Sequence, residues 1–322
     1  MGTVEHAEHP PASNVKLLLG LSALLVALSF ALPLYLIPSN VLPHLSNEAR
    51  NVYACTAWAG WAHFVFAYVG QMRGFAARRD SKTTLRAGLF ALAILVALLV
   101  LVMLRSWMGV GIFGAVVWIY FIDHFLKAEQ FFKHGMVPQE STWSRWVRSY
   151  QPILSFGWLS IVLLNMGGIA SYRWIVWGVS FLMALLFLAT GGWQDLRDRD
   201  QRGTFVSLFF VAEAAVWGTL IGFASSEFLS GVYIFHIAFG SFYHYLGSYF
   251  AAAERRKPGD FWHTPLSIVL VNFAIGALGF FVAFRMMPPW LTPVLGVEWF
   301  TLWVGLHLVA SDVFPMIKRM KG

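Results

Sequence analysis

Five of the ten histidines in this chain lie inside long apolar segments: His63, His124, His236, His244 and His307. An imidazole in such surroundings needs a hydrogen-bond partner, a charge or a metal. Imidazole nitrogens are ligands for iron, zinc and copper. A set of four without thiolates, in a hydrophobic cavity, points to non-haem Fe(2+) acting on an apolar substrate. The alternative is that a pair of these histidines binds a haem.

The basic residues that end each apolar segment set the depth of these histidines. For four histidines we measure the distance along the helix to this basic residue: from His63 to Arg73, His124 to Lys133, His244 to Arg255 and His307 to Lys318. At 1.5 Å per helical residue, all four imidazoles stand about 14–17 Å above the basic ends, near the bilayer midplane. His236 lies one level further out and is the alternative to His244. The sequence therefore predicts a shared site of four histidines.

Carboxylates and hydroxyls near these histidines are candidates for orienting them. A metal-bound imidazole usually donates its second N–H to such an acceptor. The candidates are Tyr68, Asp123, Glu129, Tyr249 and Asp312. Four of them follow a histidine by five residues, which is not the best same-face spacing on a helix, so their partners are expected on neighbouring helices. Glu213, midway along another segment, is interpreted first as a helix–helix contact.

The elements that carry these residues are predicted to be transmembrane helices. Hydrophobic residues make up 58% of the 322-residue chain and charged residues 12%, and the apolar blocks have the length of a membrane-crossing helix. They lie near 17–37, 54–72, 85–104, 109–132, 151–167, 173–192, 205–226, 229–251, 262–284 and 294–315. We expect an all-α integral membrane protein, a bundle of about ten transmembrane helices forming one domain over residues 1–322. Residues 1–16 form a short tail, and 134–150 is the longest loop.

The distribution of basic residues predicts the orientation. Nineteen Lys and Arg lie in the two termini and alternate loops, against four in the other loops. The positive-inside rule then places both termini in the cytoplasm of a multi-pass protein of a bacterial inner membrane. The net charge of +7 is explained by this pattern, so nucleic acid is not expected as a partner. The single Cys55 excludes an intramolecular disulfide.

Two segments resemble a known family. HFLKAE (124–129) looks like the H-F-G-x-x-D motif of the bacteriorhodopsin-related, Blh-type β-carotene 15,15′-dioxygenases, and LHLVASD (306–312) is similar to their P-H-x-x-x-x-D segment. The resemblance implies histidines on transmembrane helices that hold an iron, which splits β-carotene with dioxygen to give retinal. By motif position it implies His63, His124 and His244 as ligands, with His307 next.

The sequence thus predicts an iron-dependent oxygenase of the membrane. Its partners would be dioxygen and a carotenoid or another long isoprenoid or lipid. Two other functions fit the same intramembrane polar groups: a proton-coupled transporter, and a haem- or pigment-binding membrane subunit of a larger complex.

Overall fold

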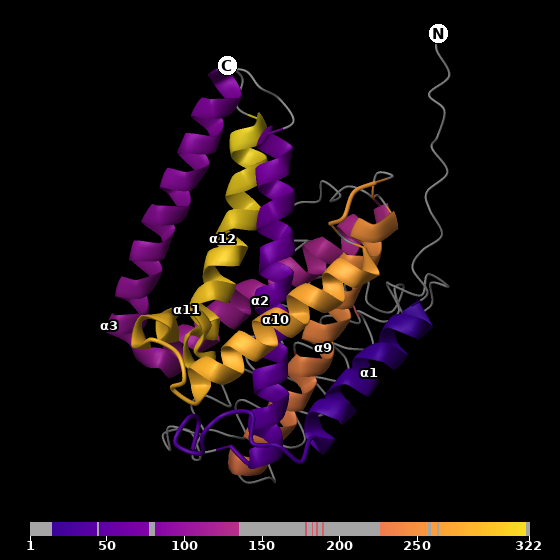
Figure 1. The fold of residues 1–322 in the computed structure, drawn as a ribbon, viewed down its shortest axis with the longest axis vertical. Helices are drawn as coiled ribbons and strands as arrows, with labels where there is room; N and C mark the ends of the chain where they lie inside the picture. The colour runs from indigo at the N-terminus through magenta and orange to yellow at the C-terminus, as the bar shows by residue number, and fades with distance from the viewer. Residues whose placement is uncertain are drawn as a thin grey trace.

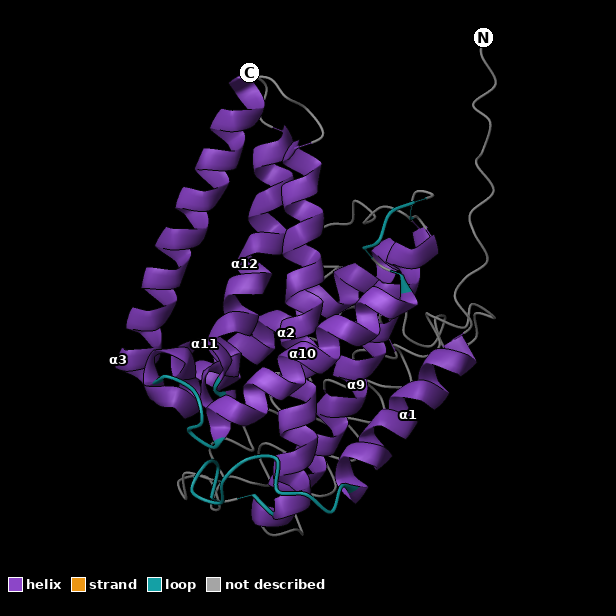
Figure 2. Cartoon of the chain, in the orientation of Figure 1, coloured by secondary structure: helices purple, strands orange, loops and turns teal. Residues whose placement is uncertain are grey.

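The computed structural model describes most of the N-terminal and C-terminal thirds of the chain. The described residues are 15–43, 45–76, 81–134, 178, 182, 185, 189, 226–254, 256, 259–262 and 264–319. All regular structure among them is helical (Figure 2). The predicted spans at 151–167, 173–192 and 205–226, with Glu213, lie outside these residues apart from isolated positions, as do the first fourteen residues and the loop after His134.

Six long helices and three short ones make up this part of the chain. They are α1 (Val15–Ala31), α2 (Asn47–Ala76), α3 (Ser81–His134), α9 (Ser226–Glu254), α10 (Pro265–Ala283), η3 (Pro289–Leu291), α11 (Thr292–Leu295), η4 (Val297–Trp299) and α12 (Phe300–Arg319). Three segments are long and apolar enough to cross a membrane, namely Thr84–Val110, Pro265–Ala283 and Val297–Ile317. The all-helical prediction is confirmed for the described residues, while the count of ten spans stays a prediction.

Helix α1 ends at Ala31, short of the predicted end near residue 37. Pro33 disfavours a helical conformation for the residue before it. The buried side chain of Asn51 then forms hydrogen bonds with backbone groups that a longer helix would have satisfied. Its Nδ2 donates to the carbonyl oxygens of Leu32 (3.2 Å) and Leu34 (2.8 Å), and its Oδ1 accepts from the amide of Leu36 (3.2 Å). This long-range contact replaces the last turn and a half of the predicted span.

Helix α3 contains two predicted spans joined at one glycine. Gly109 has φ 78° and ψ 160°, a left-handed conformation that glycine adopts without a steric penalty. The predicted short joint at 105–109 is therefore a kink at Gly109 where two helices meet, and the two halves of α3 diverge in Figure 1. Both halves contact α12, because a Cβ built on Gly305 would lie 3.4 Å from the side chains of Leu101 and Val117.

The long described helices run in both directions across the molecule. In Figure 1, α2, α9 and α12 run upward, whereas α1, α10 and the first half of α3 run downward. The second half of α3 runs from the lower left to the upper right behind α12. Each of the four helical segments with a predicted histidine ligand therefore begins in the lower part of the view. This arrangement allows residues at similar distances from their helix ends to meet.

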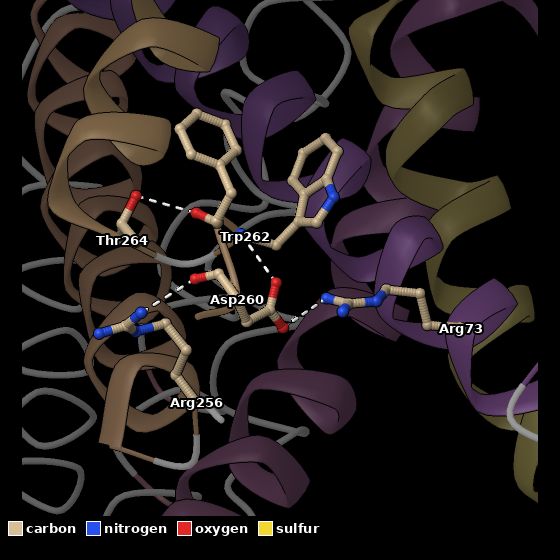
Figure 3. Close-up of polar contacts among 6 residues, drawn as sticks. Arg73, Arg256, Asp260, Trp262 and Thr264 are labelled. Carbon is tan, nitrogen blue, oxygen red and sulfur yellow. Dashed lines mark hydrogen bonds and ion pairs between the residues drawn. The ribbon is translucent and has the colours of Figure 1, made fainter. Parts of the chain in front are cut away.

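An ion pair ties the end of α2 to the connection between α9 and α10 (Figure 3). Arg73 Nη1 lies 2.7 Å from Asp260 Oδ2, and the other carboxylate oxygen accepts from the amide of Trp262 at 3.0 Å. Arg256 Nη1 donates to the carbonyl oxygen of Asp260 at 2.9 Å. Because the Arg73 side chain is half exposed, the pair itself contributes at most about 1 kcal/mol. Its main effect is to fix where the chain crosses from α9 to α10.

Close packing of α2 depends on Gly60, one turn before His63. A Cβ at this position would lie 2.6 Å from Phe300 Cζ and 2.7 Å from Tyr245 Oη. We therefore expect Gly60→Ala to lower the free energy of unfolding by about 1–3 kcal/mol, because the two rings must move. Thermal unfolding of the purified protein in detergent measures this. Gly70→Ala on the same helix is the control, since no heavy atom of the described residues lies within 4 Å of its Cβ position; equal losses in both variants would contradict the packing argument.

Candidate functional site: a cluster of four histidines

Four histidine rings from four helical segments meet in the interior. His63 comes from α2, His124 from the second half of α3, His244 from α9 and His307 from α12. The ring centroid of His63 lies 5.1 Å from that of His244 and 5.2 Å from that of His307. The centroid of His124 lies 5.4 Å from His244 and 5.2 Å from His307. Each ring therefore contacts two others, and the four form a closed circuit.

Burial of the cluster is nearly complete. The exposed fractions of His63, His244 and His307 are 7%, 2% and 4%, and His124 is partly buried. Burying a polar ring costs free energy unless its nitrogens find partners. Three such rings in one place therefore call for an explanation in terms of what they bind.

Aromatic side chains enclose the cluster. Phe64 stacks on His307 with ring centroids 4.6 Å apart and planes at 22°, and Tyr245 stacks on His63 at 5.0 Å and 26°. Phe121 and Phe125 of α3 flank His244 at 6.0 and 5.7 Å. These rings hold the imidazoles in fixed orientations and keep water away from them.

His63 and His307 differ in their hydrogen bonding. Nδ1 of His63 lies 3.0 Å from Ser248 Oγ. Both ring nitrogens of His307 are buried and have no hydrogen-bond partner among the described residues. A neutral imidazole carries one N–H donor and one lone pair, and the described residues satisfy neither of these groups on His307. An unsatisfied buried group of this kind typically costs about 1–3 kcal/mol.

The spacing of the rings fits ligands around one metal ion. A metal lies about 2.0–2.1 Å from a ligating imidazole nitrogen, which puts ligand ring centroids about 4.5–5.2 Å apart. Three of the observed separations, at 5.1–5.2 Å, lie at the upper end of this range, and the fourth, between His124 and His244, exceeds it at 5.4 Å. As they stand, no three His, Cys, Asp or Glu side chains of the described residues have the geometry of a finished metal site. Binding would therefore draw the nitrogens together by small ring movements.

The predicted orienting residues fall into two groups. The Tyr68 ring lies 6.2 Å from His307, with its buried hydroxyl lacking a partner among the described residues. The Tyr249 ring lies 6.2 Å from His63. Asp312 accepts a hydrogen bond from the hydroxyl of Tyr120 on α3, which is a neighbouring helix. The side chains of Asp123 and Glu129 lie outside the described part.

The alternative ligand His236 lies on the same helix as His244. It precedes His244 by eight residues, which is about 12 Å along the helix axis. Its side chain lies outside the described part of the chain. The ring that α9 brings into the circuit of four is therefore that of His244.

Sequence reasoning did not single out Ser248, Tyr245 or Tyr120. Ser248 follows His244 by four residues, so both lie on one face of α9. Tyr120 precedes His124 by four residues on α3 in the same way. A search for polar residues one turn from each histidine would have found both. Tyr245 and Phe64 carry no such signal, because an aromatic residue beside a histidine is common in a chain with 29 Phe and 15 Trp.

Comparison with known proteins finds no match: no protein-family model, no curated protein and no solved structure. The resemblance of residues 124–129 and 306–312 to the carotenoid-cleaving family therefore stays a prediction.

Proposed function

We propose that the chain is a multi-pass membrane enzyme in which four histidines hold a non-haem Fe(2+) that oxidises a long apolar substrate with dioxygen. The single observation that carries this proposal is the buried circuit of His63, His124, His244 and His307. A bacterial inner membrane is the proposed location, with both termini cytoplasmic. The three long apolar helices support the membrane part of this proposal.

The donor chemistry supports a metal rather than a simple helix–helix contact. Histidines that only joined helices would hydrogen-bond to each other or to neighbouring side chains. His307 instead has two nitrogens without partners among the described residues. A metal would use one lone pair and recover part of the free energy lost on burial. Nitrogen donors without thiolates suit iron.

The close packing of the rings supports non-haem iron rather than haem. A haem needs its two axial histidines on opposite faces of a wide, flat macrocycle. Here every ring lies 5.1–5.4 Å from two others, and Phe64 and Tyr245 cover two of the rings directly. A macrocycle would have to displace several of these side chains.

The surroundings of the cluster support an apolar substrate. Phe64, Phe121, Phe125 and Tyr245 contribute hydrocarbon surface and no charge. In the proposed reaction one carbon–carbon double bond of a carotenoid or another isoprenoid breaks, and each carbon takes one oxygen atom to give two carbonyl compounds, as in cleavage to retinal. Bound iron would supply the redox chemistry. The protein would fix the ligands and exclude water, and no general acid–base pair is required.

Metal analysis of the protein purified in detergent tests the proposal. We expect about one iron per chain, with no haem Soret absorption band, and turnover of an added carotenoid that depends on dioxygen. A Soret band would favour the haem- or pigment-binding subunit. A chain that binds no iron after anaerobic incubation with Fe(2+) would favour the proton-coupled transporter.

A further inference from the structure

We infer that Ser248 is a positioning residue, which fixes the tautomer of His63 so that its Nε2 presents a lone pair for the metal. The inference rests on the proposed iron site, although its structural part concerns only Ser248 and His63. Ser248 Oγ lies 3.0 Å from His63 Nδ1 and 2.7 Å from the carbonyl oxygen of Tyr245.

The direction of the hydrogen bond follows from the number of protons available. A serine hydroxyl has one hydrogen to donate and two lone pairs to accept with. Two oxygens 2.7 Å apart are at the usual distance for O–H···O, so the Ser248 hydrogen lies between Oγ and the Tyr245 carbonyl. The contact at 3.0 Å must then be an N–H of His63 donating to Ser248 Oγ. His63 therefore carries its hydrogen on Nδ1, and Nε2 keeps a lone pair.

The position of Ser248 on α9 makes this contact a link between two of the four helices. Ser248 lies one turn after His244, so one face of α9 carries both a candidate ligand and the acceptor that orients His63 of α2. The stacked ring of Tyr245 limits rotation of the same imidazole from a second side. An acceptor on the second ring nitrogen is the usual means by which proteins orient metal-bound histidines. Here a serine hydroxyl takes that place for His63.

This arrangement predicts a graded response to substitution at residue 248. Ser248→Ala removes the acceptor and frees His63 to protonate either nitrogen. Ser248→Thr keeps a hydroxyl on the same Cβ and is the conservative control. Loss of such an orienting contact typically weakens metal binding about 10- to 100-fold. We expect about a 10-fold loss of Fe(2+) affinity in Ser248→Ala and near wild-type affinity in Ser248→Thr.

Nitrogen-15 NMR of histidine-labelled, metal-free protein tests the tautomer without depending on iron. The His63 signal is assigned by its disappearance in His63→Leu. Wild-type His63 should show a protonated Nδ1 and an unprotonated Nε2, and Ser248→Ala should shift the population toward protonated Nε2, with Ser248→Thr restoring the wild-type pattern.

Two results would overturn the inference: a protonated Nε2 in the wild-type protein, or a tautomer that Ser248→Ala leaves unchanged. Titration with Fe(2+) separates the two proposals. If the wild type binds no iron but the tautomer responds as predicted, the iron site is wrong and Ser248 still orients His63. If the wild type binds iron and Ser248→Ala binds it equally well, the positioning role is wrong.

Discussion

His307→Leu should lose iron binding and, in the metal-free protein, become more stable than the wild type. Both ring nitrogens of His307 are buried without partners among the described residues, so removing the ring removes an unsatisfied polar group. A leucine of similar volume against Phe64 should recover about 1–3 kcal/mol of unfolding free energy. Thermal unfolding of the metal-free proteins and metal analysis of the iron-incubated proteins measure the two effects. A residue kept at a cost in stability is typical of a functional site.

His63→Leu is the matched control for this prediction. It removes a ring that is equally buried but hydrogen-bonded to Ser248. His63→Leu should also lose iron binding, but its metal-free form should not be more stable than the wild type. The account of His307 would be contradicted if His307→Leu were destabilised in the metal-free state, because its nitrogens would then have partners that stabilise the fold.

His244→Ala should strongly weaken iron binding, whereas His236→Ala should leave it nearly intact. His244 contacts both His63 and His124 within the circuit, while His236 lies about 12 Å away along α9. Loss of a residue that orients a metal ligand lowers metal affinity by up to about 100-fold. Loss of a ligand itself should lower the affinity for Fe(2+) by at least as much. Anaerobic titration with Fe(2+) provides the measurement.

His236→Ala is the matched control for His244→Ala, because both variants remove an imidazole from α9. Iron loss in His236→Ala with retention in His244→Ala would reassign the ligand from α9. If both variants kept full iron binding, α9 would not supply a ligand to the site.

A common depth for the four histidines is predicted from the sequence, because basic residues mark the ends of transmembrane helices. Arg73 and Lys318, for example, fix the heights of His63 and His307 within their helices. Equal depth does not fix which way a ring points, since that depends on how the helices are rotated about their axes. The structure supplies this rotation for the described segments, and it brings all four rings into contact.

Long-range contacts account for the features that the sequence did not predict. The end of α1 at Ala31 depends on the side chain of Asn51, which is far along the chain from the carbonyls it binds. Asp312 accepts a hydrogen bond from Tyr120, which lies nearly two hundred residues earlier in the chain. The role of Ser248 depends on His63 in the same way. No local pattern of hydrophobic residues contains this information, because each contact is made between helices that are distant in sequence.

X-ray absorption at the iron K-edge of the iron-loaded wild-type protein tests the four-histidine iron site most directly. We predict a first shell of nitrogen and oxygen only, near 2.1 Å as for other imidazole-bound metals, with the multiple-scattering pattern of several imidazoles and no porphyrin signature. The imidazole contribution should fall in any iron retained by His307→Leu. A first shell without imidazole scattering, or iron binding that is unchanged when His63, His244 and His307 are all replaced by leucine, would contradict the account.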